Sequence, residues 1–324
     1  MNNYSPLQRF LHRTVLSSKL MREIMFDIEQ SLFLKKNENF DDAHVFVAGL
    51  ARSGTTVLLN AIHASGQFAS LSYDDMPFIL APNFWAKISP IKNSSEYQER
   101  AHGDNIRVSS NSPEAFEEVF WETFGNDSQV YEELFLNFIS LVLKKNNKAR
   151  YLSKNNQNIR RLDYISQVLP HSKILIPFRE PTQQASSLFF QHKKFINMQN
   201  EDVFVRNYMK WIGHSEFGLD YKMIKSSNLL YPDAISLNHW LEQWYLTYKP
   251  IFELSSMNRN IHLIDYKSLC NDPNVWTNIK STLEINHEVK FSFNETIRTI
   301  NYTYDSKLSD KCSSLYESLV ALSL

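Results

Sequence analysis

The segment VFVAGLARSGTTVLLNAI, residues 45–62, constrains the fold more than any other stretch of this chain. It starts with β-forming residues, passes two glycines, Gly49 and Gly54, and continues with apolar residues at helical spacing. A strand that runs through a glycine turn into a helix leaves backbone N–H groups free at the helix start, and the helix dipole favours negative charge there. The segment therefore predicts an anion-binding loop between a strand and a helix.

This loop has only the first half of a Walker A sequence. Four residues separate the two glycines, but Thr55 stands where the lysine belongs, and the cation Arg52 comes before the second glycine. A nucleoside triphosphatase needs that lysine on the β- and γ-phosphates and a metal ion beside the following hydroxyl. We therefore expect a phosphate site without the triphosphate machinery, made by Arg52, Ser53, Gly54, Thr55 and Thr56.

Strand and helix patterns alternate along the rest of the chain. HVFVAG, ARYLSK, KILIPF and IHLIDY are strand-like, and helical patterns separate them. This order predicts an α/β fold with a P-loop-like central parallel sheet flanked by helices. A largely helical insertion is expected at about 80–150, with a break near GNDS. We expect one domain over 1–324, with a helical arm (1–40), a core (44–285) and a C-terminal extension (286–324).

Composition excludes several classes of protein. The net charge of −1 argues against general binding to nucleic acid, and Cys270 and Cys312 have neither metal-like spacing nor the number for a disulfide framework. No apolar run is long enough to span a bilayer, and the start of the chain lacks the apolar core of a signal peptide. We expect a cytoplasmic protein. The arm is expected to dock on the domain, with peripheral membrane contact as the alternative.

Two segments resemble the nucleotide-binding motifs of one enzyme family. RSGTT after a strand resembles the 5′-phosphosulfate loop of the sulfotransferases that use 3′-phosphoadenosine 5′-phosphosulfate (PAPS). KILIPFREPTQQASSLFF resembles their 3′-phosphate motif, with Arg179 at a strand end and Ser187 eight residues later. An arginine and a serine at this spacing have the reach to grip one phosphate by charge-assisted hydrogen bonds.

Further likenesses extend the resemblance over residues 44–285. Tyr266 in IHLIDYKSLCNDP matches a tyrosine that lies near the adenine, although Lys267 and Ser268 replace an acidic pair. Lys154 matches a lysine at a strand end in the bacterial and tyrosylprotein-type branch, although Asn156 replaces the proline two residues later.

The resemblance implies transfer of a sulfuryl group from PAPS to a hydroxyl acceptor, leaving 3′-phosphoadenosine 5′-phosphate (PAP). The acceptor would be a carbohydrate, a glycolipid or a small metabolite, and no metal would be needed. Arg52 and the N–H groups of 53–56 would hold the 5′-phosphosulfate, and Lys154 would be a second cation near it. Arg179 and Ser187 would hold the 3′-phosphate.

Several residues are candidates for the base that takes the acceptor proton. Related enzymes use a glutamate or a histidine, in the tyrosylprotein-type branch a carboxylate just beyond the helix that follows the loop. The corresponding segment of this chain is SLSYDDMPF. It contains Asp74 and Asp75, and we favour Asp75 as the base. The histidine candidates are His63, which a core position also explains, and His102. His214 and Glu216 in WIGHSEFG either line an acceptor pocket or cap a helix.

Two other functions are compatible with a phosphate loop of this kind. One is a P-loop kinase or nucleotide hydrolase, which the missing lysine argues against. The other is a non-catalytic nucleotide-binding module that kept the fold.

Overall fold

The computed structural model describes residues 5–34, 43–89, 98–99, 107–108, 111–125, 130–224, 229–289, 291–295, 297, 299–300 and 302–324. The described strands are β1 (Val45–Val47), β2 (Phe68–Ala69), β3 (Gln98–Glu99), β4 (Arg107–Val108), β5 (Arg150–Lys154), β6 (Lys173–Phe178) and β7 (Ile261–Asp265).

The described helices surround these strands. Those before β5 are α1 (Pro6–Leu16), α2 (Lys19–Phe33), α3 (Thr55–His63), the 3-10 helix η1 (Tyr73–Asp75), α4 (Pro82–Ile88), α5 (Glu118–Phe124) and α6 (Val130–Asn146). The later ones are the 3-10 helix η2 (Asn156–Arg160), α7 (Leu162–Val168), α8 (Pro181–Glu201), α9 (Val203–Trp211), α10 (Leu237–Met257), α11 (Tyr266–Asn271), α12 (Pro273–Thr282) and α13 (Ser306–Ala321).

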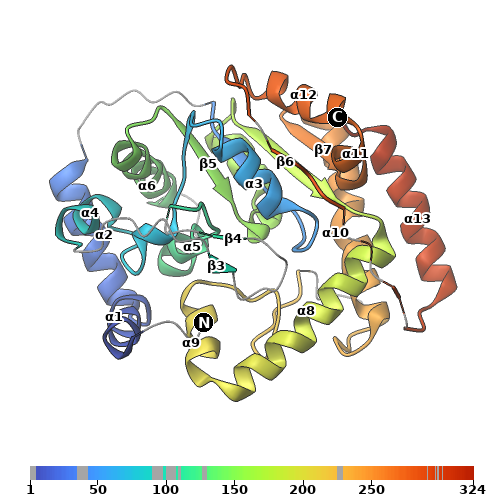
Figure 1. Ribbon diagram of the computed structural model, residues 1–324, viewed down its shortest axis with the longest axis horizontal. Helices are drawn as coiled ribbons and strands as arrows, with labels where there is room; N and C mark the ends of the chain where they lie inside the picture. Colours follow the sequence, from blue (N-terminus) through green and yellow to red (C-terminus); the bar gives the residue numbers. More distant parts are fainter. Residues whose placement is uncertain are drawn as a thin grey trace.

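A five-stranded sheet in the order β2-β5-β1-β6-β7 forms the centre of the molecule (Figure 1). Each neighbouring pair in it is parallel, which confirms the predicted α/β fold with a parallel sheet. The central strand β1 lies between β5 and β6, and its last residue, Val47, pairs with Lys154 and with Leu175. The loops that follow β1, β5 and β6 therefore leave the sheet at the same edge.

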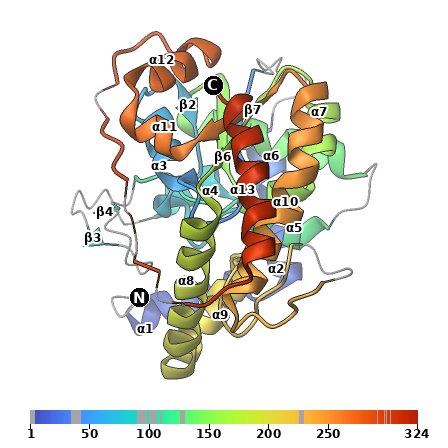
Figure 2. The same ribbon diagram turned by 90° about the vertical axis from the view of Figure 1, so that its right-hand side faces the viewer.

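The two faces of the sheet are covered by different helices, because side chains alternate along each strand. Val45 and Val47 are buried on one face, in a cluster with Leu58 of α3 and Ile279 of α12. Phe46, between them, belongs to the cluster on the other face, which α6, α8 and α10 cover. Figure 2 shows α3 and α12 on one side of β6 and β7 and α10 on the other.

The insertion and the two ends of the chain pack around this core. The insertion includes α4, α5 and α6, and the break expected near GNDS falls between Phe124 and Val130. Helices α1 and α2 contact α9 and the insertion, and α13 packs along α10 and β7 (Figure 2). In the part of the chain that the structure describes, no helix combines the length and apolar character needed to cross a membrane.

Candidate functional site

The predicted loop has the geometry of an anion site at the start of α3. Gly54 is the N-cap of α3, with φ +102°, and it offers no side chain to pair the first N–H groups of the helix. Arg52 also has positive φ, +67°, a conformation that costs a non-glycine residue about 1 kcal/mol or more. The loop therefore holds its arginine in a strained backbone, which is typical of ligand-binding turns.

The second motif lies beside this loop, because β6 is next to β1 in the sheet. Arg179 follows β6 directly, and α8 begins two residues later. Nε of Arg52 donates a hydrogen bond of 3.1 Å to Oγ of Ser187 on α8, so two residues 135 positions apart in the sequence meet here. The two motifs singled out in the sequence therefore lie side by side in the fold.

Tyr266 lies where the two motifs meet. The guanidinium carbon of Arg179 is 5.4 Å from the centre of its ring, and a Cβ placed on Gly54 would lie 2.3 Å from its Cδ2. Burial raises the pKa of the Tyr266 phenol well above its usual value, and the nearby charges of Arg179 and Arg52 act in the opposite direction. The ring is thus packed against the loop and lies within the field of both cations.

The end of β5 brings further polar groups to the same edge. Lys154 is the last residue of β5 and is 7% exposed. Oγ1 of Thr55 donates to Oδ1 of Asn156 at 3.5 Å, and Nδ2 of Asn156 donates to Oε1 of Glu216 at 3.3 Å. A chain of side chains therefore leads from the phosphate loop to the turn after α9.

A comparison with known protein families identifies the family of this chain. Residues 44–227, more than half of the chain, match the family model described as "Sulfotransferase family". The protein belongs to the sulfotransferase family. This confirms the resemblance and the expectation of an enzyme of this family. No curated protein matched the chain in a second comparison.

Two solved sulfotransferases share the fold over nearly the whole chain. Sulfotransferase STF9 from Mycobacterium avium superposes with a TM-score of 0.51 at 12% identity, covering 98% of this chain and 79% of the other. Sulfotransferase STF1 from Mycobacterium tuberculosis H37Rv gives 0.50 at 12% identity, covering 98% and 87%. At 12% identity, this similarity shows that the proteins share a fold.

Two residues that are next to motif residues in this sulfotransferase-family chain have a buried polar atom without a hydrogen-bond partner in the described part of the structure. Gln157, next to Asn156, has a buried Nε2, and Ser186, next to Ser187, has a buried Oγ. Neither atom has a hydrogen-bond partner within the described residues. Buried polar atoms without partners are costly unless a ligand or water satisfies them.

Gln184 joins the two motifs, and sequence reasoning missed it. Its side chain is fully buried; Oε1 accepts the backbone N–H of Arg179 at 3.2 Å and the indole N–H of Trp244 at 3.0 Å. Its Nε2 donates to the carbonyl oxygen of Ala51 at 3.1 Å. In the sequence it is one polar residue among several in PTQQASS, and nothing there distinguishes it from a surface glutamine.

Replacing Gln184 with leucine is expected to weaken PAP binding about tenfold or more, because three partners, two of them buried, would lose their hydrogen bonds and the spacing of the two motifs would change. Titration calorimetry with PAP measures this. Gln191→Leu is the matched control, since Gln191 is equally buried on α8 but its Nε2 has no partner in the described part of the chain. Equal effects of the two changes would contradict the linking role of Gln184.

The predicted base Asp75 lies in a buried ion pair. Its carboxylate is 1% exposed; Oδ2 accepts from the N–H of Ser72 at 2.8 Å and from its hydroxyl at 3.2 Å. Oδ1 lies 2.9 Å from Nζ of Lys145, in the last turn of α6. These partners give Asp75 a structural role at the end of η1. That Asp75 takes the acceptor proton stays a prediction.

The other base candidates lie in various places. Asp74 is half-buried beside Asp75. His63 is the last residue of α3, at the opposite end of the helix from the loop, and burial lowers its pKa. His102 lies outside the described residues. His214 lies in the same turn as Glu216, and its Nε2 is 3.3 Å from the carbonyl oxygen of Ala115.

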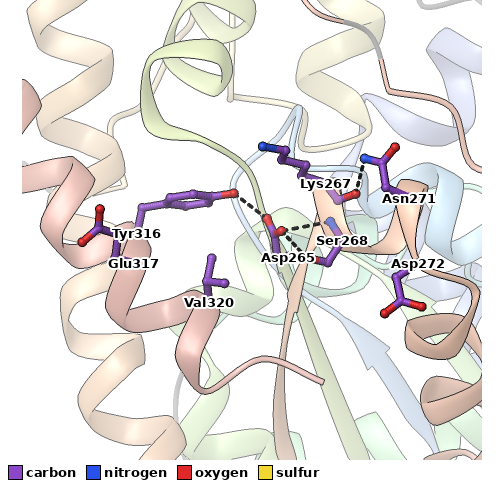
Figure 3. Close-up of a pocket in the computed structure, with 8 residues that line it drawn as sticks. All are labelled: Asp265, Lys267, Ser268, Asn271, Asp272, Tyr316, Glu317 and Val320. Carbon is purple, nitrogen blue, oxygen red and sulfur yellow. Dashed lines mark hydrogen bonds between the residues drawn. The ribbon is translucent and has the colours of Figure 1, made fainter.

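A separate hollow of about 540 Å³ lies between α11 and α13 (Figure 3). The hydroxyl of Tyr316 donates to Oδ1 of Asp265 there at 2.8 Å, and Oδ2 accepts from the hydroxyl of Ser268. Its eight lining residues include three carboxylates and one lysine. This charge balance does not suit a nucleotide with two phosphates, so the hollow is distinct from the site at Arg52.

Proposed function

We propose that this protein transfers the sulfuryl group of PAPS to a hydroxyl acceptor. The observation that carries the proposal is the contact between Arg52 of the loop and Ser187 of the second motif, with both arginines near Tyr266. Two cationic groups near one aromatic ring suit a nucleotide that carries phosphates on both its 3′ and 5′ positions.

The roles follow from position. Arg52 and the N–H groups of 53–56 would hold the 5′-phosphosulfate, and Arg179 the 3′-phosphate. Ser187 would contribute its hydroxyl, and Tyr266 would face the adenine. Lys154, beside the loop at the end of β5, would balance the charge that grows on the leaving phosphate oxygen. Held in line with the donor, an acceptor oxygen displaces PAP from sulfur.

The acceptor class comes from the family rather than from the contacts. We propose a hydroxyl of a carbohydrate, a glycolipid or a small metabolite, because sulfuryl transfer of this type needs an oxygen nucleophile. The cytoplasmic location and membrane contact of the N-terminal arm both stay predictions.

The test is incubation of the purified protein and PAPS with fractionated extracts, followed by mass spectrometry for products heavier by one SO₃ group. We expect products that need PAPS, persist when magnesium is chelated, and disappear with Arg52→Met. PAP should also bind in titration calorimetry. Products heavier by a phosphate group with ATP and magnesium would instead favour a kinase. PAP binding without any product would favour a non-catalytic module.

A further inference from the structure

The turn between α9 and α10 that carries Glu216 is anchored on two sides. Gly213 packs so closely on Glu118 that a Cβ there would lie 2.4 Å from Cγ of the glutamate. The N–H of Gly218 donates to Nδ1 of His192 at 3.2 Å. Because both ends of the turn are held, the position of Glu216 between them is well defined.

From this turn, the carboxylate of Glu216 reaches toward the phosphate loop. Only the amide of Asn156 separates it from the hydroxyl of Thr55, through hydrogen bonds of 3.3 and 3.5 Å. Thr55 is the first residue of α3, where the first N–H groups of the helix and the helix dipole would favour a bound anion. An acceptor oxygen in line with a sulfuryl group at this helix start would therefore lie between the loop and Glu216.

Two other carboxylates, Glu118 and Asp75, are already committed to other partners. Glu118 accepts two hydrogen bonds of 2.8 Å from Arg161 and is buried, and burial raises its pKa. Asp75 is paired with Lys145. Glu216, in contrast, is half-buried and accepts its hydrogen bond from a neutral amide, and the charge of Arg160 acts on it without a hydrogen bond in the described part of the chain.

Resting on the proposed function, we propose that Glu216, and not the sequence-predicted Asp75, is the general base of the reaction. Its Oε takes the proton of the acceptor hydroxyl as the new bond from the acceptor oxygen to sulfur forms. The bond from sulfur to the 5′-phosphate oxygen breaks, and its electron pair leaves on PAP. Glu216 then returns the proton to water.

The test compares Glu216→Gln with Asp75→Asn, two changes that keep size and remove a negative charge. We expect Glu216→Gln to slow sulfuryl transfer from PAPS about 100-fold or more. Transfer is measured to the acceptor that the mass-spectrometric screen returns and, without acceptor, to water. PAP should bind to this variant about fivefold more tightly, because a like charge near the 5′-phosphate is lost. Asp75→Asn should change turnover much less than Glu216→Gln.

The outcomes separate this inference from the proposed function. Lost turnover with equal or tighter PAP binding supports Glu216 as the base, since a merely structural role would weaken binding too. Lost turnover together with weakened PAP binding in Glu216→Gln would overturn it. So would unchanged turnover in Glu216→Gln, most clearly if Asp75→Asn loses activity. If the unmodified protein binds no PAP, the proposed function fails, and this inference fails with it.

Discussion

Replacement of Arg179 by methionine is expected to lower the affinity for PAP by about 10- to 100-fold while leaving the affinity for adenosine 5′-monophosphate nearly unchanged. Arg179 lies beside Tyr266 and would hold the 3′-phosphate, a group that adenosine 5′-monophosphate lacks. Charge-assisted hydrogen bonds to phosphate are among the strongest a side chain makes. Titration calorimetry with the two nucleotides measures the ratio of affinities.

The matched variant is Arg52→Met, which should change the nucleotide affinities in the complementary way. Binding of PAP and adenosine 5′-monophosphate should both weaken, whereas binding of adenosine 3′-monophosphate should not. Arg13→Met, at an exposed position of α1, is the control and should change none of the three affinities. If Arg179→Met weakened both nucleotides equally, Arg179 would not be the reader of the 3′-phosphate.

Gly54→Ala is expected to abolish PAP binding under conditions where the unmodified protein is saturated, a loss of about 100-fold or more. A Cβ at this position would lie 2.3 Å from Cδ2 and 2.5 Å from Cε2 of Tyr266, so the ring or the loop must move. The φ of +102° adds strain for any residue with a side chain. Calorimetry with PAP measures the binding, and chemical denaturation measures the free energy of unfolding.

Gly66→Ala separates the effect of the positive φ from the effect of the clash with Tyr266. Gly66 has φ +68°, but a Cβ there would meet no atom within 4 Å. This variant should lose about 1 kcal/mol of stability and keep its PAP affinity. Adding Tyr266→Ala to Gly54→Ala should recover much of the stability that Gly54→Ala loses, because it removes the clash. No such recovery would contradict the packing of the ring on the loop.

Much of the fold was predictable because its signals are local. The strand at Val45–Val47, the glycine turn and the helix at Thr55–His63 follow from residue type and spacing over short windows. The same is true of β6 and α8, with Pro181 at the first turn of the helix. These patterns predicted the parallel sheet and placed Arg52 and Arg179 at strand ends, where phosphate sites occur.

The details of the site were less predictable. The position of Asp75 after the helix favours it as the base, but its pairing with Lys145 depends on how α6 packs. The resemblance pairs Ser187 with Arg179, and the structure adds a hydrogen bond from Nε of Arg52 to the Ser187 hydroxyl. No pattern in the sequence distinguishes Gln184 from its neighbour Gln183. The difference in their burial appears only in the folded structure.

The sequence by itself determined β1, β5, β6 and β7, many of the helices and the two cationic turns, because backbone torsion preferences and the burial of alternate residues act over a few positions. Only the tertiary structure decided that Arg52 reaches Ser187, that Gln184 joins both motifs and that Asn156 connects Thr55 to Glu216. Each of these contacts joins residues from separate elements. Strand order and helix packing set such contacts, and no local pattern encodes them.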